Sequence, residues 1–195
     1  MIDHEKLLQL AKLRRGHFCF ESGHHGDVWL ELDAMFATPK AVVPFAREIA
    51  GKIRTFKLDA VCGPMTGGAR LAEMVASELG VTAYPCERTE AQIESGEVRS
   101  IYRLRLEPRD KVAGKRIGIV DDAINAGSAV RETYRELKSA GAEVVLVATL
   151  IMLGTAGEKF ALDHGVGFET LTCLDSNLWR ADECPMCRAG IPISR

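Results

Sequence analysis

One stretch decides the fold of this chain: Lys115-Arg116-Ile117-Gly118-Ile119-Val120-Asp121-Asp122-Ala123-Ile124-Asn125-Ala126-Gly127-Ser128-Ala129-Val130-Arg131. It opens with a short apolar run rich in Ile and Val, which predicts a buried strand. Two adjacent acids follow where this strand should end, and a turn of small residues then leads into a helical pattern from Ser128 to about Ala140. Gly141 stands where a helix C-cap glycine is expected. The stretch therefore predicts a strand, an acid pair, a turn and a helix in direct succession.

The turn Ala123–Ala129 has the composition of a phosphate-binding loop. Small residues let backbone amides approach an anion closely, and the helix that follows presents free N–H groups and the positive end of its dipole. Asn125 and Ser128 add side-chain hydrogen-bonding groups. Asp121 and Asp122 repel phosphate and suit ribose hydroxyls or a divalent cation instead. These residues together predict a ribose-phosphate site.

The run Val120–Ala129 resembles the phosphoribosyl-pyrophosphate (PRPP) motif of type I phosphoribosyltransferases, and more narrowly that of orotate phosphoribosyltransferases. The family pattern is four apolar residues, two acids, two apolar residues, Thr-Thr-Gly or Thr-Ala-Gly, and a small hydroxyl residue. The resemblance implies transfer of a phosphoribosyl group from Mg-PRPP to a base nitrogen, with Asp121 and Asp122 on the ribose hydroxyls and 123–129 around the 5′-phosphate. The alternative is an ordinary strand end with solvated acids.

Length and composition favour one α/β domain with a small appendage, because the chain has 195 residues and 47% of them are hydrophobic. The net charge of −2 gives no electrostatic reason to expect a nucleic-acid partner. The segment Met1–Lys6 lacks the apolar core of a signal peptide, and the longest apolar run, Val144–Leu153, is too short to span a bilayer. We expect a cytoplasmic protein without a membrane partner.

The N-terminal region predicts a helix and a hairpin. Apolar spacing indicates an amphipathic helix from His4 to about Arg15, and alternation around central glycines indicates a hairpin over 17–32. This hairpin resembles the hood that covers the base in orotate phosphoribosyltransferases, where Trp29 would stack on the base or pack the hood onto the body. The adjacent His24 and His25 are expected in an exposed loop rather than at a metal site, because neighbouring strand side chains point to opposite faces.

A second anion-binding loop precedes the acid pair. A helix is expected from Pro39 to about Phe56, then a strand over Asp59–Gly63 and a helix over Ala69–Leu79. Between them lies Gly63-Pro64-Met65-Thr66-Gly67-Gly68, which is neither a Walker loop nor a G-x-G-x-x-G fingerprint. By resemblance it is the pyrophosphate loop, with backbone amides of Met65–Gly68 facing the diphosphate. Arg88, after the next strand (Val81–Tyr84), is the candidate phosphate contact.

The segment Thr89–Gly114 is long and charged, so it is either disordered or a functional lid. Residues 101–106 alternate and predict one arm of a hairpin, with Arg103 and Arg105 on a single face. The family keeps its mobile catalytic loop here, and that loop often comes from the neighbouring subunit of a homodimer. Closure of such a loop excludes water from the reaction.

Later strands are expected over Glu143–Leu153 and Gly165–Cys173. The alternation of strands and helices predicts an α/β fold whose central, mostly parallel sheet has helices on both faces, the type I phosphoribosyltransferase fold. Ligands should gather at the carboxyl ends of its strands. We expect an N-terminal helix and hood over 1–36, a PRPP-binding core over 37–175 with a mobile loop at about 89–114, and a tail over 176–195.

The cysteines divide into two groups. Four lie in apolar segments and are expected to be buried, reduced thiols: Cys19, Cys62, Cys86 and Cys173. Cys184 and Cys187 form a Cys-Pro-x-Cys pair, which a branch of the orotate phosphoribosyltransferases shares. The pair is half of a zinc site, a reduced structural pair or a labile disulfide, and the spacing does not show whether Cys173 and a histidine would complete four zinc ligands.

The chain departs from the family pattern at four places. The Lys-x-x-Lys-x-His-Gly segment of the mobile loop is missing, which leaves Arg103, Arg105 and Lys111 as candidates. Glu21 replaces the hood lysine, and Asn125 replaces the threonine that touches orotate. No arginine follows the strand after the PRPP helix, where the family pairs one with the orotate carboxylate.

A carboxylate-bearing base favours a bidentate arginine, so the departures leave the acceptor base open. They also raise an alternative function, a PRPP- or nucleotide-binding regulatory protein that has lost turnover. A third reading is a zinc-binding interaction module built on the tail.

Overall fold

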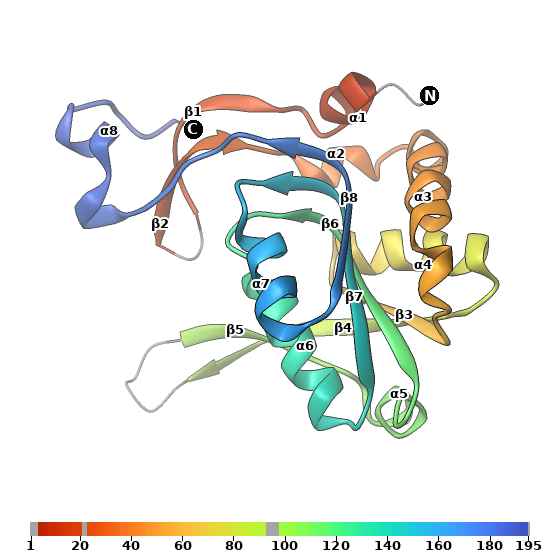
Figure 1. The fold of residues 1–195 in the computed structure, drawn as a ribbon. Coiled ribbons are helices and arrows are strands. Elements are labelled where there is room, and N and C mark those ends of the chain that lie inside the picture. The colour runs from red at the N-terminus through yellow and green to blue at the C-terminus, as the bar shows by residue number, and fades with distance from the viewer. Residues whose placement is uncertain (1–3, 21–22, 93–97, 195) are drawn as a thin grey trace.

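The computed structural model describes residues 4–20, 23–92 and 98–194. Its main sheet has the strand order β5-β4-β3-β6-β7-β8, in which every neighbouring pair is parallel except β4 and β5. Figure 1 shows α3 and α4 on one side of this sheet and α6 and α7 on the other. The expected α/β fold with a mostly parallel sheet is therefore confirmed. The strands of this sheet are β3 (Ala60–Pro64), β4 (Thr82–Gln92), β5 (Val98–Arg103), β6 (Arg116–Ile124), β7 (Glu143–Leu153) and β8 (Gly167–Leu174).

The helices cover the sheet in two layers, and several short ones had no clear sequence signal. The long helices are α3 (Pro39–Ile53), α4 (Gly67–Leu79), α6 (Ser128–Ser139) and α7 (Ala156–His164). The shorter ones are α1 (His4–Leu10), α2 (Leu32–Met35), η1 (Arg54–Phe56), α5 (Leu106–Lys111), η2 (Ala181–Glu183) and α8 (Pro185–Arg188). Among the described helices, none combines the length and apolar character needed to cross a bilayer.

The core lies on both faces of the sheet because successive strand residues point to opposite sides. Val61 and Val120 pack with α3 and α4 in one apolar cluster. Ala60, Cys62 and Ile119 pack with α6 and α7 in the other. This burial on both faces explains why β3 and β6 are near-continuous apolar runs rather than alternating ones.

The sheet changes direction between β3 and β6. From β3 the chain passes through α4 to β4 on one side, and it later returns to place β6 on the other side of β3. A crevice at the carboxyl ends of the strands is expected at such a switch point. The glycine-rich loop after β3 and the acid pair of β6 both lie there.

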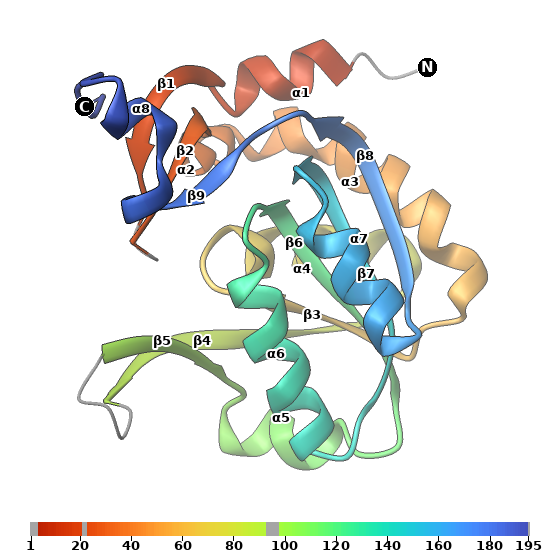
Figure 2. The same ribbon diagram turned by 60° about the vertical axis from the view of Figure 1, so that its left-hand side comes forward.

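A smaller sheet forms the hood, with the order β1-β2-β9. Its strands are β1 (Arg14–Cys19), β2 (His24–Trp29) and β9 (Leu178–Arg180), all paired antiparallel. Figure 2 shows the C-terminal segment beside β1 and β2 at one end of the main sheet. The expected N-terminal hairpin is confirmed, whereas its pairing with the tail had not been predicted.

The helix expected to reach Arg15 ends at Leu10 instead. Lys12 adopts a φ of 43°, which turns the chain out of the helix, and Arg14 and Arg15 already belong to β1. The apolar residues of 7–13 follow a helical spacing, but the left-handed residue, which that spacing does not reveal, ends the helix within it.

The charged segment over 89–114 is largely regular. β4 continues to Gln92 and pairs with β5 in a hairpin, and α5 follows; residues 93–97, including Glu94 and Glu97, lie outside the described part. The expected strand arm at 101–106 is confirmed as far as Arg103, where β5 ends. Figure 2 shows the hairpin of β4 and β5 extending from the body of the molecule.

Candidate active site

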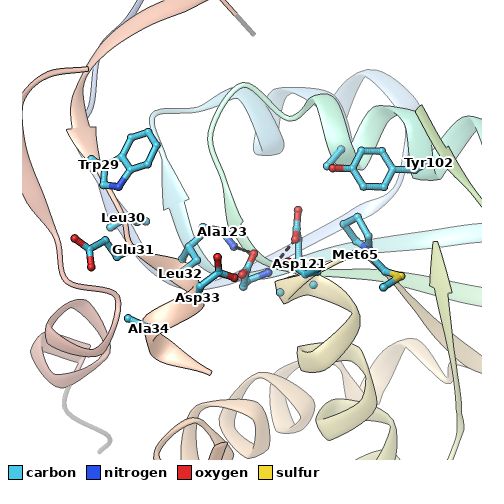
Figure 3. Close-up of a pocket in the computed structure, with 16 residues that line it drawn as sticks. Trp29, Leu30, Glu31, Leu32, Asp33, Ala34, Met65, Tyr102, Asp121 and Ala123 are labelled. Atoms are coloured by element: carbon cyan, nitrogen blue, oxygen red, sulfur yellow. Dashed lines mark hydrogen bonds between the residues drawn. The ribbon is translucent and has the colours of Figure 1, made fainter. Parts of the chain in front are cut away.

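A cleft of about 560 Å³ opens at the switch point of the sheet. It is lined by 29–34 after β2, by 64–68 at the end of β3, by 121–123 of β6, and by Tyr102 and Ala129. A second cavity of about 290 Å³ shares Trp29, Asp121, Ala123 and Ala129 with it and is otherwise lined by Phe20 and 124–128. Figure 3 shows Trp29 and Tyr102 on opposite sides of the cleft, with Asp121 between them. The first cavity has a volume within the usual range for small-molecule sites.

Asp121 and Asp122 lie within β6, which continues to Ile124, rather than after the end of the strand. Each side chain is 6% exposed. The Asp122 amide donates to Asp121 Oδ1 at 3.0 Å, and the Ala123 amide donates to Asp122 Oδ1 at 2.8 Å. Adjacent strand residues point to opposite faces, yet both acids line the cleft, because it opens at the carboxyl end of β6 where both faces meet it. Backbone amides hold both carboxylates.

Burial raises the pKa of both carboxyls. For Asp121 the pKa is well above its usual value, first because of desolvation and then because of the neighbouring negative charge of Asp122. For Asp122 desolvation also raises the pKa, although the Ala123 amide partly offsets this effect. Such carboxyls favour a partner that supplies hydroxyl donors or positive charge.

Two glycines bring the start of α4 against the acid pair. A Cβ atom on Gly67 would overlap Asp122 Oδ2, and one on Gly68 would crowd Asp121 Oδ1. Only glycine permits this approach, so the loop after β3 and the acids of β6 form one surface.

The loop Pro64–Gly68 lines the cleft as the sequence led us to expect, with one correction. The Met65 amide donates to the Cys86 carbonyl at 2.8 Å, so it is not available to an anion. The Met65–Thr66 peptide is cis. The amides of Gly67, Gly68 and Ala69 belong to the first turn of α4, where no intrahelical acceptor exists for them. Gly67 and Gly68 line the cleft, so their amides are the ones available to an anion.

The loop 123–129 lines the second cavity and leads into α6. Gly127 has a φ of 72° at the N-cap, a conformation that glycine adopts without strain. The Arg131 amide closes the first turn on the Gly127 carbonyl at 3.0 Å. The preceding amides of this first turn have no intrahelical acceptor, so they and the positive end of the α6 dipole are available to an anion beside Asp121.

Trp29 ends β2 and lines both cavities. Its ring stacks on Phe20, with centroids 5.9 Å apart and an interplanar angle of 11°. Trp29 therefore packs against Phe20 within the hood and also lines the cleft. The two roles that the sequence left open, stacking on the base and packing the hood onto the body, stay predictions.

The three candidate arginines lie in different places, and none of them is among the residues that line the two cavities. Arg88 of β4 is opposite Tyr102 of β5, so the two side chains share the face that meets the cleft, and its Nε donates to Ser100 Oγ at 3.0 Å. Arg103, one residue further along, points to the other face and pairs with Glu136 of α6 at 2.7 Å. Arg105 pairs with Glu87 at 2.5 Å. Glu87 is opposite Arg103 in the register of β4 and β5, so Arg103 and Arg105 lie on one face as expected. That face carries the ion pairs with Glu136 and Glu87 and is not the one that Tyr102 presents to the cleft, and a role of these arginines at the ligand stays a prediction.

Arg103→Ala should reduce stability rather than turnover. Glu136 is only 1% exposed and is held by both Arg103 and Arg109. Loss of one partner should lower the free energy of unfolding by about 1–3 kcal/mol, with a fall of roughly 2–4 °C in melting temperature per kcal/mol. Arg88→Ala should instead lower kcat by about 10²-fold with little change in melting temperature. Calorimetry and a pyrophosphate-release assay separate the two variants, and a larger loss of turnover in Arg103→Ala would contradict this assignment.

The histidines and cysteines differ most from expectation. His25 is buried on β2 rather than exposed in a loop, and it lies with His17, Cys184 and Cys187 in one cluster away from the cleft. Cys173 is exposed and does not belong to this cluster. The expectation of buried thiols is confirmed for two residues, Cys62 and Cys86, but wrong for Cys19 and Cys173, which are exposed.

Several residues that line the cleft had not been singled out from the sequence. Tyr102 had a signal, because the alternation of 101–106 places it on the face opposite to Arg103. The segment 30–34, which brings Glu31 and Asp33 to the cleft, had none. Glu21, the position of the missing hood lysine, lies outside the described residues.

Comparison with known proteins agrees with this geometry. The sequence profile of the Phosphoribosyl transferase domain matches residues 31–184. The orotate phosphoribosyltransferase of Caldanaerobacter subterraneus subsp. tengcongensis is 31% identical over 98% of this chain and 96% of its own length. That of Carboxydothermus hydrogenoformans is 32% identical over 95% of this chain and 91% of its own length.

Solved structures show the same fold. The UMP synthase of Leishmania donovani superimposes with a TM-score of 0.69 at 25% identity, over 88% of this chain and 35% of that one. The adenine phosphoribosyltransferase of Thermoanaerobacter pseudethanolicus gives 0.65 at 18% identity, over 88% of this chain and 100% of that one. With a profile match over most of its length and full-length relatives above 30% identity, the chain belongs to the phosphoribosyltransferase family, among the relatives of the orotate phosphoribosyltransferases.

Proposed function

We propose that this phosphoribosyltransferase uses Mg-PRPP as the donor and orotate as the acceptor, and releases pyrophosphate. One observation carries the proposal: a buried acid pair lies between the N-termini of two helices at the switch point of the sheet. A doubly phosphorylated ribose has this charge pattern, with hydroxyls in the middle and an anion at each end.

Different residues of the chain bind the different parts of PRPP. The first turn of α6 binds the 5′-phosphate, and the first turn of α4 binds the diphosphate, because both present free amides and a positive helix end. Asp121 and Asp122 accept hydrogen bonds from the ribose hydroxyls. As the bond from C1′ to the diphosphate breaks, positive charge develops on the ribose, and the acid pair stabilises that charge. Arg88 assists the departing diphosphate.

Magnesium suits the charge of this cleft. Among the described residues that line it, four are acids and none is a lysine or arginine; the acids are Glu31, Asp33, Asp121 and Asp122. A diphosphate cannot enter such a cleft without a cation, and carboxylate and phosphate oxygens are the ligands that Mg²⁺ prefers. Asp121 and Asp122 would hold the ion together with oxygens of the substrate, and the ion would supply positive charge to the leaving group.

Orotate is the first choice of acceptor because the sequence similarity includes the hood. The relatives named as orotate phosphoribosyltransferases align over 95–98% of this chain, whereas the domain profile begins only at residue 31. The hood is the part that covers the cleft on the side of Trp29.

The function is tested by pyrophosphate release from Mg-PRPP with orotate, uracil, adenine and hypoxanthine offered separately. We expect release with orotate alone. Release with a different base would support a phosphoribosyltransferase but would overturn orotate as its acceptor. Calorimetric binding of PRPP without release on any base would instead support the regulatory alternative.

Trp29→Ala should weaken binding of the base more than binding of PRPP. The ring faces the cleft from the hood, and loss of base stacking costs about 1–3 kcal/mol, or roughly 10- to 100-fold in KM for the base. Trp29→Phe should recover most of the loss. Steady-state kinetics with each substrate varied in turn checks this, and an equal rise in KM for both substrates would indicate a packing role only.

We also propose a homodimer in which the partner subunit supplies a cation to the cleft. The support is the lack of lysine and arginine among the described cleft-lining residues, together with the hairpin of β4 and β5 that extends from the body (Figure 2). Light scattering should give twice the chain mass, and turnover per chain should fall when the protein is diluted until the dimers dissociate. A monomer with full activity would overturn this proposal.

A further inference from the structure

Four potential metal ligands from the two ends of the chain meet behind the hood. They are His17 of β1, His25 of β2, and Cys184 and Cys187 at the start and within α8. Their donor atoms all lie within 4.8 Å of one another. No other group of three or more His, Cys, Asp or Glu in the described part of the chain has donor atoms placed to share an ion.

The distances within this cluster fit a tetrahedral ion. His17 Nε2 lies 2.9 Å from His25 Nδ1, 3.5 Å from Cys184 Sγ and 3.6 Å from Cys187 Sγ. Cys187 Sγ lies 3.2 Å from His25 Nδ1. Zinc bonds of about 2.0–2.3 Å at tetrahedral angles place neighbouring donor atoms roughly 3.3–3.8 Å apart. Two of these four distances lie in that range, and the two that involve His25 Nδ1 are short of it by a few tenths of an ångström. The remaining pairs of donor atoms lie within 4.8 Å of each other.

Local structure aims these donors at one point. His17 and His25 come from the two arms of a hairpin, and His25 Nδ1 and His17 Nε2 face each other across it. Cys184 is the N-cap of α8 and Pro185 is its first residue, so Cys184 and Cys187 lie one turn apart on the same side of the helix. Because the donors come from separate segments, the sequence alone showed only the Cys-x-x-Cys half.

A hydrogen bond to the backbone fixes the tautomer of His17, which leaves one ring nitrogen with a lone pair for a metal. His17 Nδ1 lies 2.8 Å from the Ile191 carbonyl, which can only accept a hydrogen bond. The Nδ1 proton is therefore committed to this bond, and the lone pair of Nε2 points into the cluster. Metal-bound histidines are held in this way by backbone carbonyls. The tail reinforces the contact, because the Ser194 amide donates to the His17 carbonyl at 2.6 Å.

Burial makes the cluster a closed site rather than a reactive one. His17 is 1% exposed, His25 7% and Cys184 0%, so three of the four donors are shielded from water. Two thiolates and two imidazoles in a closed tetrahedron match structural zinc, whereas Mg²⁺ and Ca²⁺ prefer oxygen.

We propose that His17, His25, Cys184 and Cys187 bind one structural Zn²⁺, which joins the C-terminal tail to the hood. Binding releases the thiol protons of Cys184 and Cys187 and leaves the redox state of the protein unchanged. The ion lies on β2 upstream of Trp29, so it holds the strand that delivers Trp29 to the cleft. This site is separate from the magnesium and PRPP of the proposed function.

The test is metal content, measured without reference to activity. Protein purified under reducing conditions, dialysed against a chelator and reloaded with Zn²⁺ should hold about one ion per chain. Co²⁺ in place of Zn²⁺ should give the strong visible bands of a tetrahedral ion and a thiolate-to-cobalt charge-transfer band. Binding of less than about 0.1 ion per chain, or a cobalt spectrum without thiolate character, would overturn the proposal.

Matched variants distinguish these four ligands from their neighbours. Cys184→Ser, Cys187→Ser and His25→Gln should each lower the zinc affinity at least about 10-fold. Cys173→Ser and His24→Gln should leave it unchanged, because Cys173 is outside the cluster and His24 points to the opposite face of β2 from His25. Equal zinc affinity in the ligand variants and the control variants would overturn the assignment. So would a Cys184–Cys187 disulfide that persists in protein purified under reducing conditions. Cys187 is exposed, so its variant remains informative if Cys184→Ser fails to fold.

Tryptophan fluorescence reports on the role of the ion. The chain has two tryptophans, and both lie on the hood sheet, Trp29 on β2 and Trp179 on β9. Trp179 pairs directly with His25. Removal of zinc should shift the emission to longer wavelength and reloading should reverse it, whereas an unchanged spectrum would refute the proposed connection between tail and hood.

Discussion

Asp121→Asn should remove almost all turnover and, without ligand, should unfold at a higher temperature than the parent protein. In the proposed mechanism this carboxylate accepts hydrogen bonds from the ribose hydroxyls and stabilises the positive charge of the transition state, so kcat should fall by about 10²–10³-fold. Asp122→Asn should behave similarly. Steady-state pyrophosphate release measures the first effect and calorimetry of the ligand-free protein measures the second.

The stability gain follows from the raised pKa of Asp121. In the folded protein this carboxyl keeps its proton to a higher pH than in the unfolded chain, where its usual pKa of 3.8 applies. Between those two values the folded state binds more protons, so the free energy of unfolding falls as the pH rises. Asn carries no such penalty. The advantage of Asp121→Asn should therefore be largest near neutral pH and should disappear as the pH falls to about 4.

Asp163→Asn is the matched control, because Asp163 is half exposed and forms an ion pair with Lys159 along α7. It should change neither turnover nor the pH dependence of stability. An Asp121→Asn protein that is less stable than the parent at neutral pH would show that the acid pair supports the fold.

Gly67→Ala should reduce turnover about as much as the replacement of Asp121 or Asp122 by asparagine. The added methyl group would occupy the position of Asp122 Oδ2, so either the carboxylate or the start of α4 must move. The proposed diphosphate and ribose sites meet at this contact, so we expect kcat/KM for PRPP to fall by at least about 10²-fold. Overpacking should also lower the free energy of unfolding by about 1–3 kcal/mol.

Gly51→Ala provides the comparison. Gly51 lies in α3 with no atom within 4 Å of an added Cβ, so alanine should raise stability by up to about 1 kcal/mol and leave turnover unchanged. If Gly67→Ala retained full activity, the close packing of α4 on the acid pair would have no role in catalysis.

The elements that the sequence predicted are those whose signal is local. The apolar runs of β6 and β7 exceed what a solvent-facing strand can carry, and the glycines of 63–68 and Gly127 mark turns before helices. These features are enough to predict the central sheet and the place of the acid pair, because the carboxyl ends of adjacent parallel strands lie at the same edge of the sheet.

The features that escaped prediction depend on contacts between distant segments. Nothing near Leu178 indicates that it will pair with Gly26, and nothing near Arg103 indicates that Glu136 will be buried beside it. The side chains of His24 and His25 do point to opposite faces of the strand, as expected for adjacent residues. His25 instead meets His17, which lies on the other arm of the hairpin. A pattern along the chain cannot show which side chains from two arms will meet.

The pairing of β9 with β2 has a consequence for biosynthesis. The first strands of the hood leave the ribosome early, but their third strand emerges only after the whole central sheet has been synthesised. Domains generally fold as units during synthesis. The edge of β2 that pairs with β9 therefore stays unpaired while the central sheet forms. A chain halted before residue 178 would therefore carry a two-stranded, unfinished hood over a complete central sheet.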